Sequence, residues 1–482
     1  TRNRPSTWLT GTSGPSESSC DPIPRPTDET RYAVSERSLH PVDVANRVID
    51  SGQAEPPHNR VTHQLSVVDD DVAVVESFSH CWALRTDEGL ACFDAGGVRH
   101  GAEVVDELRR WSDQPVTHLV YTHGHLDHVG GSGAFVADAE ARGHARPWFL
   151  AHEAVPDRFE RYRTTNGWNL VINRRQFGGI RNRQGLGIGD GGPAFLPDNV
   201  VEPDELFRDQ MSFTIGDRTI ELRHARGETD DHAWGWEADR RTVYSGDFTS
   251  WVFPNAGNPQ KVQRYPIEWA AAMRDMLAAG AERVYPAHGL PIVGRNRVEQ
   301  VLGDIAEALE HLAGRTLELM NEGATIDEII HEVRVPDHLQ DRPWLAPQYD
   351  EPEFVVRNVY RQFGGWWDGN AANLKPAREA SLATELASLA GSVEVLAERA
   401  VALAESGDLR LACHLVEMAV AAEPTHEGAH RARADVYWRR RAAERSLMSK
   451  GIYAAAARES EAALGGEAVG DPLGGSIRDA LG

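Results

Sequence analysis

Cysteine is scarce in this chain, long apolar runs are missing, and no block of basic residues interrupts its acidic composition. Four cysteines among 482 residues, scattered without the spacing of a metal site, argue against a disulfide framework. No apolar run approaches the roughly 18 residues that a transmembrane helix needs, so we expect no membrane-spanning segment. The formal charge of −23 argues against nucleic acid and against an anionic membrane as partners.

The few cysteines also bear on the compartment. Cys81 and Cys92 lie in adjoining apolar segments and are expected to be buried free thiols. The chain begins at Thr1 without a methionine, and no apolar core of a signal peptide is present by which export could be judged. We therefore expect a cytoplasmic protein, because free thiols persist in a reducing compartment.

Three regions differ in their residue patterns, and the length also predicts about three domains. The first thirty residues are rich in Ser, Thr, Pro and Gly, and residues 1–60 are predicted to form an extended N-terminal arm. Residues 61–297 alternate short apolar runs with turns and helical patterns, which predicts an α/β domain. Residues 298–482 show amphipathic and alanine-rich helical patterns, which predict an all-α domain.

The densest cluster of chemically capable side chains follows a predicted strand. Residues 122–131 read Thr-His-Gly-His-Leu-Asp-His-Val-Gly-Gly, so three imidazoles and a carboxylate occupy six positions of a tight turn. Imidazole and carboxylate are preferred ligands of zinc and similar divalent ions. His123 and His125 can converge on one ion, while Asp127 and His128 can reach a second ion, as in two-metal hydrolases. The alternative is a histidine-rich polar loop that holds no metal.

This pattern at a strand end resembles the metallo-β-lactamase superfamily, whose fold is an αββα sandwich with one or two metals at a sheet edge. The resemblance implies three further ligands downstream, each at the end of a strand. They match Glu228 in Gly-Glu-Thr-Asp-Asp-His, Asp247 in Ser-Gly-Asp-Phe and His288 in Pro-Ala-His-Gly. Glu228 stands where most members have histidine, as in the alkylsulfatase branch; otherwise His224 or His232 would be the ligand.

The resemblance further implies how the ligands are shared between two divalent ions, with zinc expected and manganese or iron as alternatives. Asp247 falls at the place of the metal-bridging carboxylate, where the alkylsulfatase branch tends to have glutamate, and Asp127 and Asp247 are the expected catalytic carboxylates. Asp94, at the end of an earlier predicted strand, is expected either to steady a metal-bound histidine or to form a local turn. The ligands implied for the first ion are His123, His125 and Glu228, and those for the second are Asp127, His128 and His288.

The helical region carries a second resemblance. Residues 363–370 read Phe-Gly-Gly-Trp-Trp-Asp-Gly-Asn, which is similar to a segment of the alkylsulfatase dimerisation region. This implies a homodimer or higher oligomer, with a hetero-oligomer containing a related chain as the alternative. Residues 400–424 resemble one tetratricopeptide-type helix pair. The fold implied is therefore an α/β metallo-β-lactamase sandwich followed by an all-α dimerisation domain, and the resemblance covers about residues 61–458.

The substrate side of the site is expected in two segments. Residues 162–192 form a long stretch rich in glycine and arginine, which is expected to cap a substrate or to be a structural loop packed on a partner. After Asp247, alkylsulfatases have a run rich in Thr, His and Asn and an arginine that hold sulfate; here apolar aromatics stand in that run. The expected substrate contacts are Asn166, Trp168, Arg174, Phe177, Trp251, Phe253 and Arg264.

Together, the residues and the resemblance imply a binuclear metal-dependent hydrolase, in which a hydroxide held between the metals cleaves a C–O or S–O bond of a small molecule. An alkyl sulfate ester is the first expectation. Because Trp251 and Phe253 are poor ligands for sulfate, O-dealkylation of an activated nitroaryl methyl ether, or hydrolysis of another small ester, remains the alternative. A non-catalytic subunit of a hetero-oligomer is a second alternative, against which the full ligand set argues.

Overall fold

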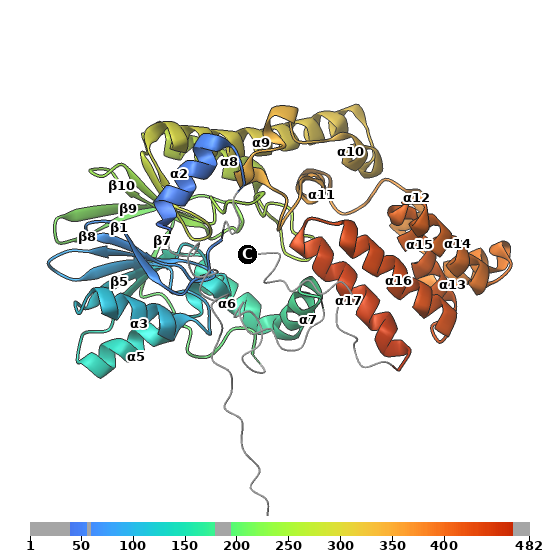
Figure 1. Cartoon of the computed structure of the whole chain (residues 1–482), viewed down its shortest axis with the longest axis horizontal. Helices are drawn as coiled ribbons and strands as arrows, with labels where there is room; N and C mark the ends of the chain where they lie inside the picture. The colour runs from blue at the N-terminus through green and yellow to red at the C-terminus, as the bar shows by residue number, and fades with distance from the viewer. Residues whose placement is uncertain (1–38, 55–58, 179–193, 466–482) are drawn as a thin grey trace, which may run out of the picture. The chain divides into compact units, whose positions relative to one another are not determined.

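Two β-sheets packed face to face form the centre of the computed structural model, which describes residues 39–54, 59–178 and 194–465 (Figure 1). Among these residues, one sheet has seven strands in the order β1 (Leu65–Asp69), β2 (Val72–Val75), β3 (Cys81–Arg85), β4 (Leu90–Phe93), β5 (Val116–Val120), β6 (Trp148–His152) and β7 (Glu205–Phe207). The described part of the other sheet has six, in the order β13 (Ile292–Val293), β12 (Arg283–Pro286), β11 (Thr242–Gly246), β10 (Ala233–Glu237), β9 (Arg218–His224) and β8 (Gln210–Ile215).

The space between the sheets is filled by alternate residues of their strands. In β3 and β4, Trp82 and Phe93 face the second sheet, where Trp82 stacks on Tyr285 and Phe93 stacks on Tyr244, each with ring centroids 4.3 Å apart. Successive side chains of a strand point to opposite faces, so the residues between them face outward to the helices. This sheet-on-sheet packing with covered outer faces is the αββα sandwich that the resemblance implied.

Helices cover both outer faces of the sandwich (Figure 1). α3 (Gly101–Trp111) and α5 (Ser132–Arg142) lie over the seven-stranded sheet, and Cys81 and Cys92 are buried beneath them as free thiols, as predicted. The other sheet packs against a core that the following helices share: α2 (Pro41–Ser51), α8 (Pro266–Ala278) and α9 (Arg295–Glu322).

Two predicted domain limits need correction. Residues 41–51, assigned to the extended arm, form α2, and its Val44, Val48 and Ile49 are buried in the core that α9 also enters. The limit at 297/298 cuts through α9, which packs along α8 and belongs to the core of the sandwich. Both helices therefore belong to the sandwich, because their buried apolar residues pack in its core. Residues 1–38 and 55–58 lie outside the described residues.

The stretch 162–192 is also different from the expected irregular cap. Its first half is helical, with α6 (Val155–Thr164) followed directly by α7 (Asn166–Gln176). The buried residues of α7 are Asn169, Ile172, Asn173 and Gln176, which repeat at helical spacing but are mostly polar. A search for apolar periodicity cannot find such a helix. Residues 179–192 lie outside the described residues.

The C-terminal region is helical, as predicted. α10 (Ile326–Glu332) begins at a capping box, where Thr325 N donates to the Glu328 carboxylate at 2.7 Å. The other described elements, besides α4 (Leu126–Val129), are η1 (Asp337–Leu339), η2 (Pro343–Leu345), α11 (Pro352–Gly364), α12 (Ala371–Leu374), α13 (Glu379–Ala390), α14 (Val393–Glu405), α15 (Leu409–Ala422), α16 (Glu427–Ala443) and α17 (Leu447–Ala463). α14 and α15 occupy the segment of the predicted tetratricopeptide-type pair, and that likeness stays a prediction.

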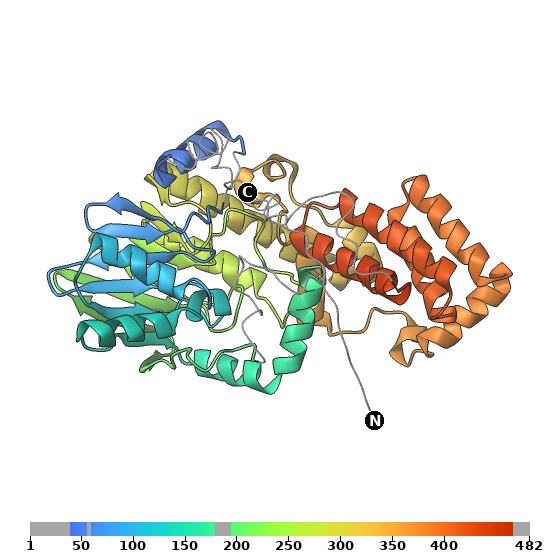
Figure 2. The same ribbon diagram turned by 60° about the horizontal axis from the view of Figure 1, so that its bottom comes forward.

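Helix α17 joins the C-terminal helices to α7 (Figure 2). A Cβ added at Gly451 would lie 1.6 Å from the carbonyl oxygen of Gln176, so the two backbones touch at this position. Ser446 Oγ also donates to Tyr349 O at 2.7 Å. The last described helix therefore supports both α7 and the segment that precedes α11.

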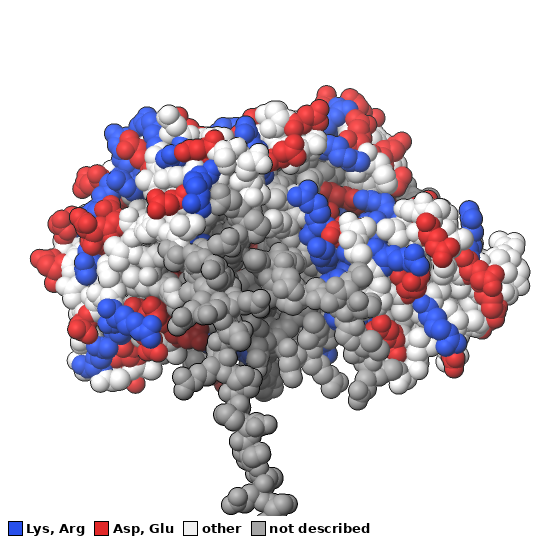
Figure 3. Space-filling model, in the orientation of Figure 1, with Lys and Arg blue, Asp and Glu red and all other residues white. Residues whose placement is uncertain are grey.

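Charge is mixed over the surface. On the face shown in Figure 3, acidic and basic side chains lie side by side, without a broad surface of one sign. No described helix combines the length and the apolar composition needed to cross a bilayer.

Candidate metal centre

All seven predicted ligands lie in segments that follow strands, and these segments meet at one edge of the sandwich. The segment after β5, a loop followed by the short helix α4, supplies four of them, and single residues come from the loops after β9, β11 and β12. In chain order the seven are His123, His125, Asp127, His128, Glu228, Asp247 and His288. Their ligand atoms form two groups, each within 4.8 Å: one contains His123, His125, Glu228 and Asp247, and the other Asp127, His128 and His288.

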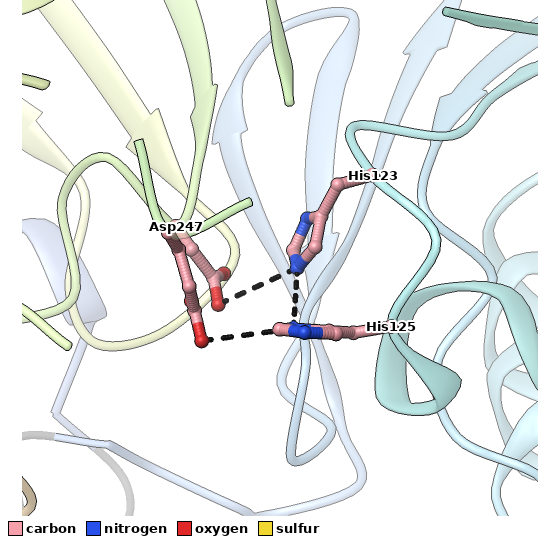
Figure 4. Close-up of side chains that lie close together, drawn as sticks. His123, His125 and Asp247 are labelled. Atoms are coloured by element: carbon pink, nitrogen blue, oxygen red, sulfur yellow. Dashed lines mark hydrogen bonds and ion pairs between the residues drawn. The ribbon is translucent and has the colours of Figure 1, made fainter. Parts of the chain in front are cut away.

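Asp247 faces His123 and His125 of its own group (Figure 4), and it also contacts His128 and His288 of the other. Its Oδ2 is 3.9 Å from His123 Nε2, while its Oδ1 is 3.4 Å from His128 Nε2 and 3.5 Å from His288 Nε2. On the outer sides, His125 Nδ1 is 3.6 Å from Glu228 Oε1. One carboxylate thus offers an oxygen to each group, which is the arrangement required of a bridging ligand.

Neighbouring residues fix the orientation of the ligand side chains. Asp94 Oδ2 accepts a hydrogen bond from His128 Nδ1 at 2.8 Å, and its Oδ1 accepts one from Thr122 N at 2.8 Å. Asp94 therefore links distant segments and turns His128 Nε2 toward the cluster; it does not merely form a local turn. On the other side, His288 Nδ1 donates to Phe78 O at 2.6 Å, which leaves its Nε2 facing Asp247.

The two alternative ligands have other roles. His232 is buried, its ring stacks on Phe248 with centroids 4.1 Å apart, and its Nε2 accepts a hydrogen bond from Asp247 N at 3.2 Å. His224 donates from Nδ1 to His232 O at 2.9 Å and stacks on His152. His232 therefore positions the backbone of Asp247, and His224 supports His232.

Sequence reasoning missed the support beneath the His-Gly-His turn. Asp231 accepts a hydrogen bond from Gly124 N at 3.1 Å and one from Arg158 Nε at 2.6 Å, and Asp231 and Arg158 are both buried. A Cβ at Gly124 would lie 2.8 Å from Arg158 Cδ, so only glycine fits between His123 and His125. Asp231 stood next to His232 in the sequence, but nothing local pointed to Arg158 as its partner.

The pKa values of the predicted ligands are shifted in different directions. Burial lowers the pKa values of His123 and His125 well below the usual range, so both imidazoles are neutral, as metal ligands must be. Burial also raises the pKa of Glu228 to about 8, although Arg264 opposes this. For His128, burial works in the downward direction, but Asp247 and Asp94 outweigh it and raise the pKa well above its usual value.

Two unsatisfied atoms test whether the residues fit metal ions. His128 Nε2 and Asp247 Oδ1 are buried, and neither has a hydrogen-bond partner within the described parts of the chain. Buried polar atoms without partners are rare in native proteins unless a ligand satisfies them. Since nitrogen and carboxylate oxygen donors converge here, the donor set fits divalent cations of the zinc type.

A cavity opens beside the predicted ligands, and only some of the predicted substrate contacts line it. Phe177 and Arg264 line it. Trp168 is 58% exposed and lies away from the cavity, as does the exposed Arg174. The side chain of Asn166 has a structural contact, because its Oδ1 accepts a hydrogen bond from the backbone N of Phe195 at 2.6 Å.

The prediction that Trp251 and Phe253 contact substrate is corrected by their burial. Both lie in the core with α8 and α9, and Trp251 Nε1 donates to Leu290 O at 2.6 Å. The Trp251 ring also covers Gly289, where an added Cβ would lie 2.5 Å from Cδ1 of the indole. Trp251 therefore holds the loop that carries His288.

Several cavity residues escaped prediction. The apolar part of the wall includes Phe78, Leu126, Tyr162, Phe195, Val252 and Tyr349, and the polar part includes Asn173, Gln176, Asn255, Asn258 and Lys261. Tyr349 belongs to the C-terminal region, and its OH accepts a hydrogen bond from Gln176 Nε2 at 2.7 Å. Residues that meet over such sequence distances leave no local signal.

Two family models match the chain. One, described as the metallo-beta-lactamase superfamily, matches residues 74–288, and one described as alkyl sulfatase dimerisation matches residues 325–463. These matches confirm both resemblances. The first covers most of the sandwich and all seven predicted ligands, and the second covers most of the C-terminal helices.

Curated relatives and solved structures agree with these matches. A linear primary-alkylsulfatase from Pseudomonas sp. is 28% identical over 399 residues, which cover 80% of this chain and 74% of the relative. An (R)-specific secondary-alkylsulfatase from Pseudomonas sp. is 22% identical over 373 residues, and the match spans 73% of this chain but 55% of that relative. The crystal structure of a stereoselective inverting sec-alkylsulfatase from Pseudomonas sp. superposes with a TM-score of 0.73 at 20% identity, covering 84% of this chain and 66% of that chain, which shows the fold.

Proposed function

Because this chain joins a metallo-β-lactamase superfamily domain to an alkylsulfatase dimerisation domain, we propose that it is a binuclear metal-dependent hydrolase of alkyl sulfate esters. The observation that carries the proposal is the pair of ligand groups on either side of Asp247. The relatives that act on alkyl sulfates support the substrate class. A hetero-oligomeric subunit without activity would not need a complete ligand set.

In this proposal, His123, His125 and Glu228 would hold one ion, His128, His288 and Asp127 would hold the other, and Asp247 would offer one carboxylate oxygen to each. Bound divalent cations, zinc in the first instance with manganese or iron as alternatives, supply an activated water and offset charge on the leaving oxygen. The chain supplies the orientation of the donors and a partly open cavity whose lining is mostly apolar. Asp127 and Asp247, the expected catalytic carboxylates, both line this cavity.

The cavity wall also favours a second candidate, hydrolysis of an activated nitroaryl methyl ether. Tyr162, Phe177 and Phe195 offer aromatic surface on which a substrate ring can pack. Trp251 and Phe253, which suggested this reading of the sequence, do not contribute because they are buried in the core. A cytoplasmic location remains part of the proposal, supported by the free thiols of Cys81 and Cys92.

Metal removal and a substrate panel test the proposed function. The purified protein is expected to hold two divalent ions per chain, to lose activity with a chelator and to regain it when metal returns. Alkyl sulfates, lactones and nitroaryl methyl ethers are then assayed with the same metal-loaded protein. Hydrolysis of ethers but not of sulfates would replace the first substrate class with the second. In oxygen-18 water, label in the alcohol shows attack on carbon, and label in the sulfate shows attack on sulfur.

We also propose that the chain forms a homodimer through its exposed apolar residues near α11 to α13. Phe363, Trp366, Leu374 and Leu389 are 53%, 74%, 53% and 83% exposed, and all lie within the dimerisation match. Large apolar side chains at such exposure mark interaction surfaces when they cluster.

The oligomer is tested by changing its most exposed aromatic residue. Trp366→Ser is expected to weaken dimerisation by roughly tenfold or more, because buried tryptophans dominate interface energies. Analytical ultracentrifugation over a dilution series measures the change. Trp148→Ser, at a tryptophan that is 51% exposed on the sandwich, is the matched control and should leave the mass unchanged. Equal masses for both variants at every dilution would exclude this surface, and a mass that does not match two copies would point to a related partner chain.

A further inference from the structure

A third group of potential metal ligands lies outside the cavity. It consists of His63, His100 and Glu103, whose ligand atoms lie within 4.8 Å of one another. His63 Nδ1 and His100 Nδ1 are 3.1 and 3.2 Å from the same oxygen of Glu103, Oε2. The two imidazole rings stack with centroids 4.7 Å apart. Both histidines therefore present the same ring nitrogen to one carboxylate.

The separations of these atoms suit one tetrahedral ion. With zinc–ligand bonds of about 2.0–2.2 Å, neighbouring donors of a tetrahedron lie about 3.3–3.6 Å apart, so the three donors need only a small outward shift to hold zinc. Imidazole nitrogen and carboxylate oxygen are also the donor types that zinc and similar ions prefer. The side chains of His63 and Glu103 are 34% and 56% exposed, so water can reach the fourth position and the ion can exchange.

Local helix geometry explains only part of this cluster. His100 precedes α3 and Glu103 lies in its first turn, so these two residues are neighbours along the chain. His63 comes from the segment before β1, and its backbone has a φ of 55°. This left-handed conformation is uncommon for a residue with a side chain, and such strain is concentrated at functional sites. Tertiary structure therefore brings the second imidazole to the carboxylate.

Contacts with Glu76 hold His63 in this conformation. His63 N donates to Glu76 O at 3.0 Å, and Thr62 Oγ1 donates to the Glu76 carboxylate at 2.7 Å. Arg60 pairs with the same carboxylate at 3.2 Å. Because Glu76 directly follows β2, the sheet itself positions the His63 imidazole.

The segment 59–64 also reaches the predicted catalytic centre. Asn59 Nδ2 donates to Phe78 O at 3.2 Å, and the same carbonyl accepts the hydrogen bond from His288 Nδ1 at 2.6 Å. An ion that fixes His63 would therefore stabilise the segment that supports the orientation of His288.

We propose that His63, His100 and Glu103 form an additional metal site, which binds one exchangeable divalent ion of the zinc type and ties the segment 59–64 to the start of α3. The ion is separate from those proposed around Asp247, because the ligand groups share no residue. Its role is to stabilise the fold beside the catalytic centre, and it takes no part in hydrolysis.

Zinc chloride alone is the probe, titrated calorimetrically into full-length protein that has been loaded with metal and desalted, which removes an exchangeable ion. The wild type is expected to take up one further ion per chain. Glu103→Gln keeps the shape of the side chain but removes its charge, and it should weaken this binding by roughly 100-fold or more, because even the loss of a group that hydrogen-bonds to a metal ligand costs about 10- to 100-fold. Glu140→Gln makes the same change at an exposed position of α5 and should bind zinc as the wild type does.

A thermal melt gives a second measurement that does not depend on activity. Added zinc should raise the Tm of the wild type, because an ion that binds only the folded chain stabilises it. The rise should disappear in His63→Gln. His338→Gln is the matched control, since His338 and Glu307 form a surface pair 3.0 Å apart, and this variant should keep the full rise.

The outcomes separate this site from adventitious binding and from the proposed function. No further ion in the wild type, or a further ion that Glu103→Gln and His63→Gln both still bind, would overturn the inference, as would loss of the ion in His338→Gln. If His63→Gln does not fold, Glu103→Gln decides the test, because the Glu103 side chain is mostly exposed. Zinc uptake through Glu103 in a chain that hydrolyses no ester would overturn the proposed function and leave this site standing.

Discussion

Asp247→Ala is expected to reduce kcat/KM by roughly ten-thousand-fold, as loss of a central catalytic group does, and to leave fewer than two metal ions per chain. The reason is geometric. Asp247 Oδ2 faces His123 at 3.9 Å, and Oδ1 faces His128 at 3.4 Å and His288 at 3.5 Å, so one change removes a donor from both groups. Elemental analysis after desalting and steady-state kinetics on the preferred substrate measure the two effects.

The control for this variant is an aspartate without a role at the site. Asp113, whose side chain is 92% exposed, is replaced in Asp113→Ala, which should keep two ions and full activity. Asp247→Asn removes the charge of the side chain but keeps its shape and one oxygen donor. We therefore expect the asparagine variant to retain more metal than the alanine variant. Two ions and wild-type kinetics in Asp247→Ala would disprove the bridging role.

The ligand positions could be predicted because each carries a local signal. His123, Glu228, Asp247 and His288 all lie within a few residues of a strand end, and glycine stands beside each of them in the sequence. Strand periodicity extends over only a few residues, so it is readable without knowledge of the fold. The order of the strands in the sheets brings these strand ends together. That order was predicted from the resemblance to a known sandwich and not from the local patterns.

The substrate side could not be predicted in this way. Trp251 and Phe253 are aromatic residues close to Asp247 in the sequence, but aromatic character indicates burial and does not tell which surface is contacted. Conversely, α7 turns a polar face inward, so Asn173 and Gln176 looked like loop residues. Tyr349 reaches the cavity from 173 positions beyond Gln176, its hydrogen-bond partner. Such contacts depend on tertiary packing and have no sequence pattern of their own.

The second large effect is expected on stability, from the pair beneath the His-Gly-His turn. Arg158→Met should lower the free energy of unfolding by about 3–5 kcal/mol, because it leaves the buried carboxylate of Asp231 without its partner. The side chains of Arg158 and Asp231 are 2% and 0% exposed, and Arg158 Nε donates to Asp231 Oδ2 at 2.6 Å. Burial raises the pKa of Asp231, but Arg158 outweighs this and lowers it below the usual value, so the carboxylate is charged in the intact pair. Removal of Arg158 leaves burial unopposed by this partner, which makes the charged carboxylate unfavourable. Urea unfolding measures the loss.

A matched arginine on the same helix distinguishes this buried pair from a surface ion pair. Arg163 pairs with Glu202 at 2.6 Å, but both side chains are about half exposed, and Arg163→Met should change stability by no more than about 1 kcal/mol. The double variant Arg158→Met/Asp231→Leu removes both charges and should be more stable than Arg158→Met alone. Because Asp231 also accepts from Gly124 N at 3.1 Å, the single variant should lose metal affinity as well. A loss below 1 kcal/mol with metal affinity retained would show that the turn between His123 and His125 holds its shape without this pair.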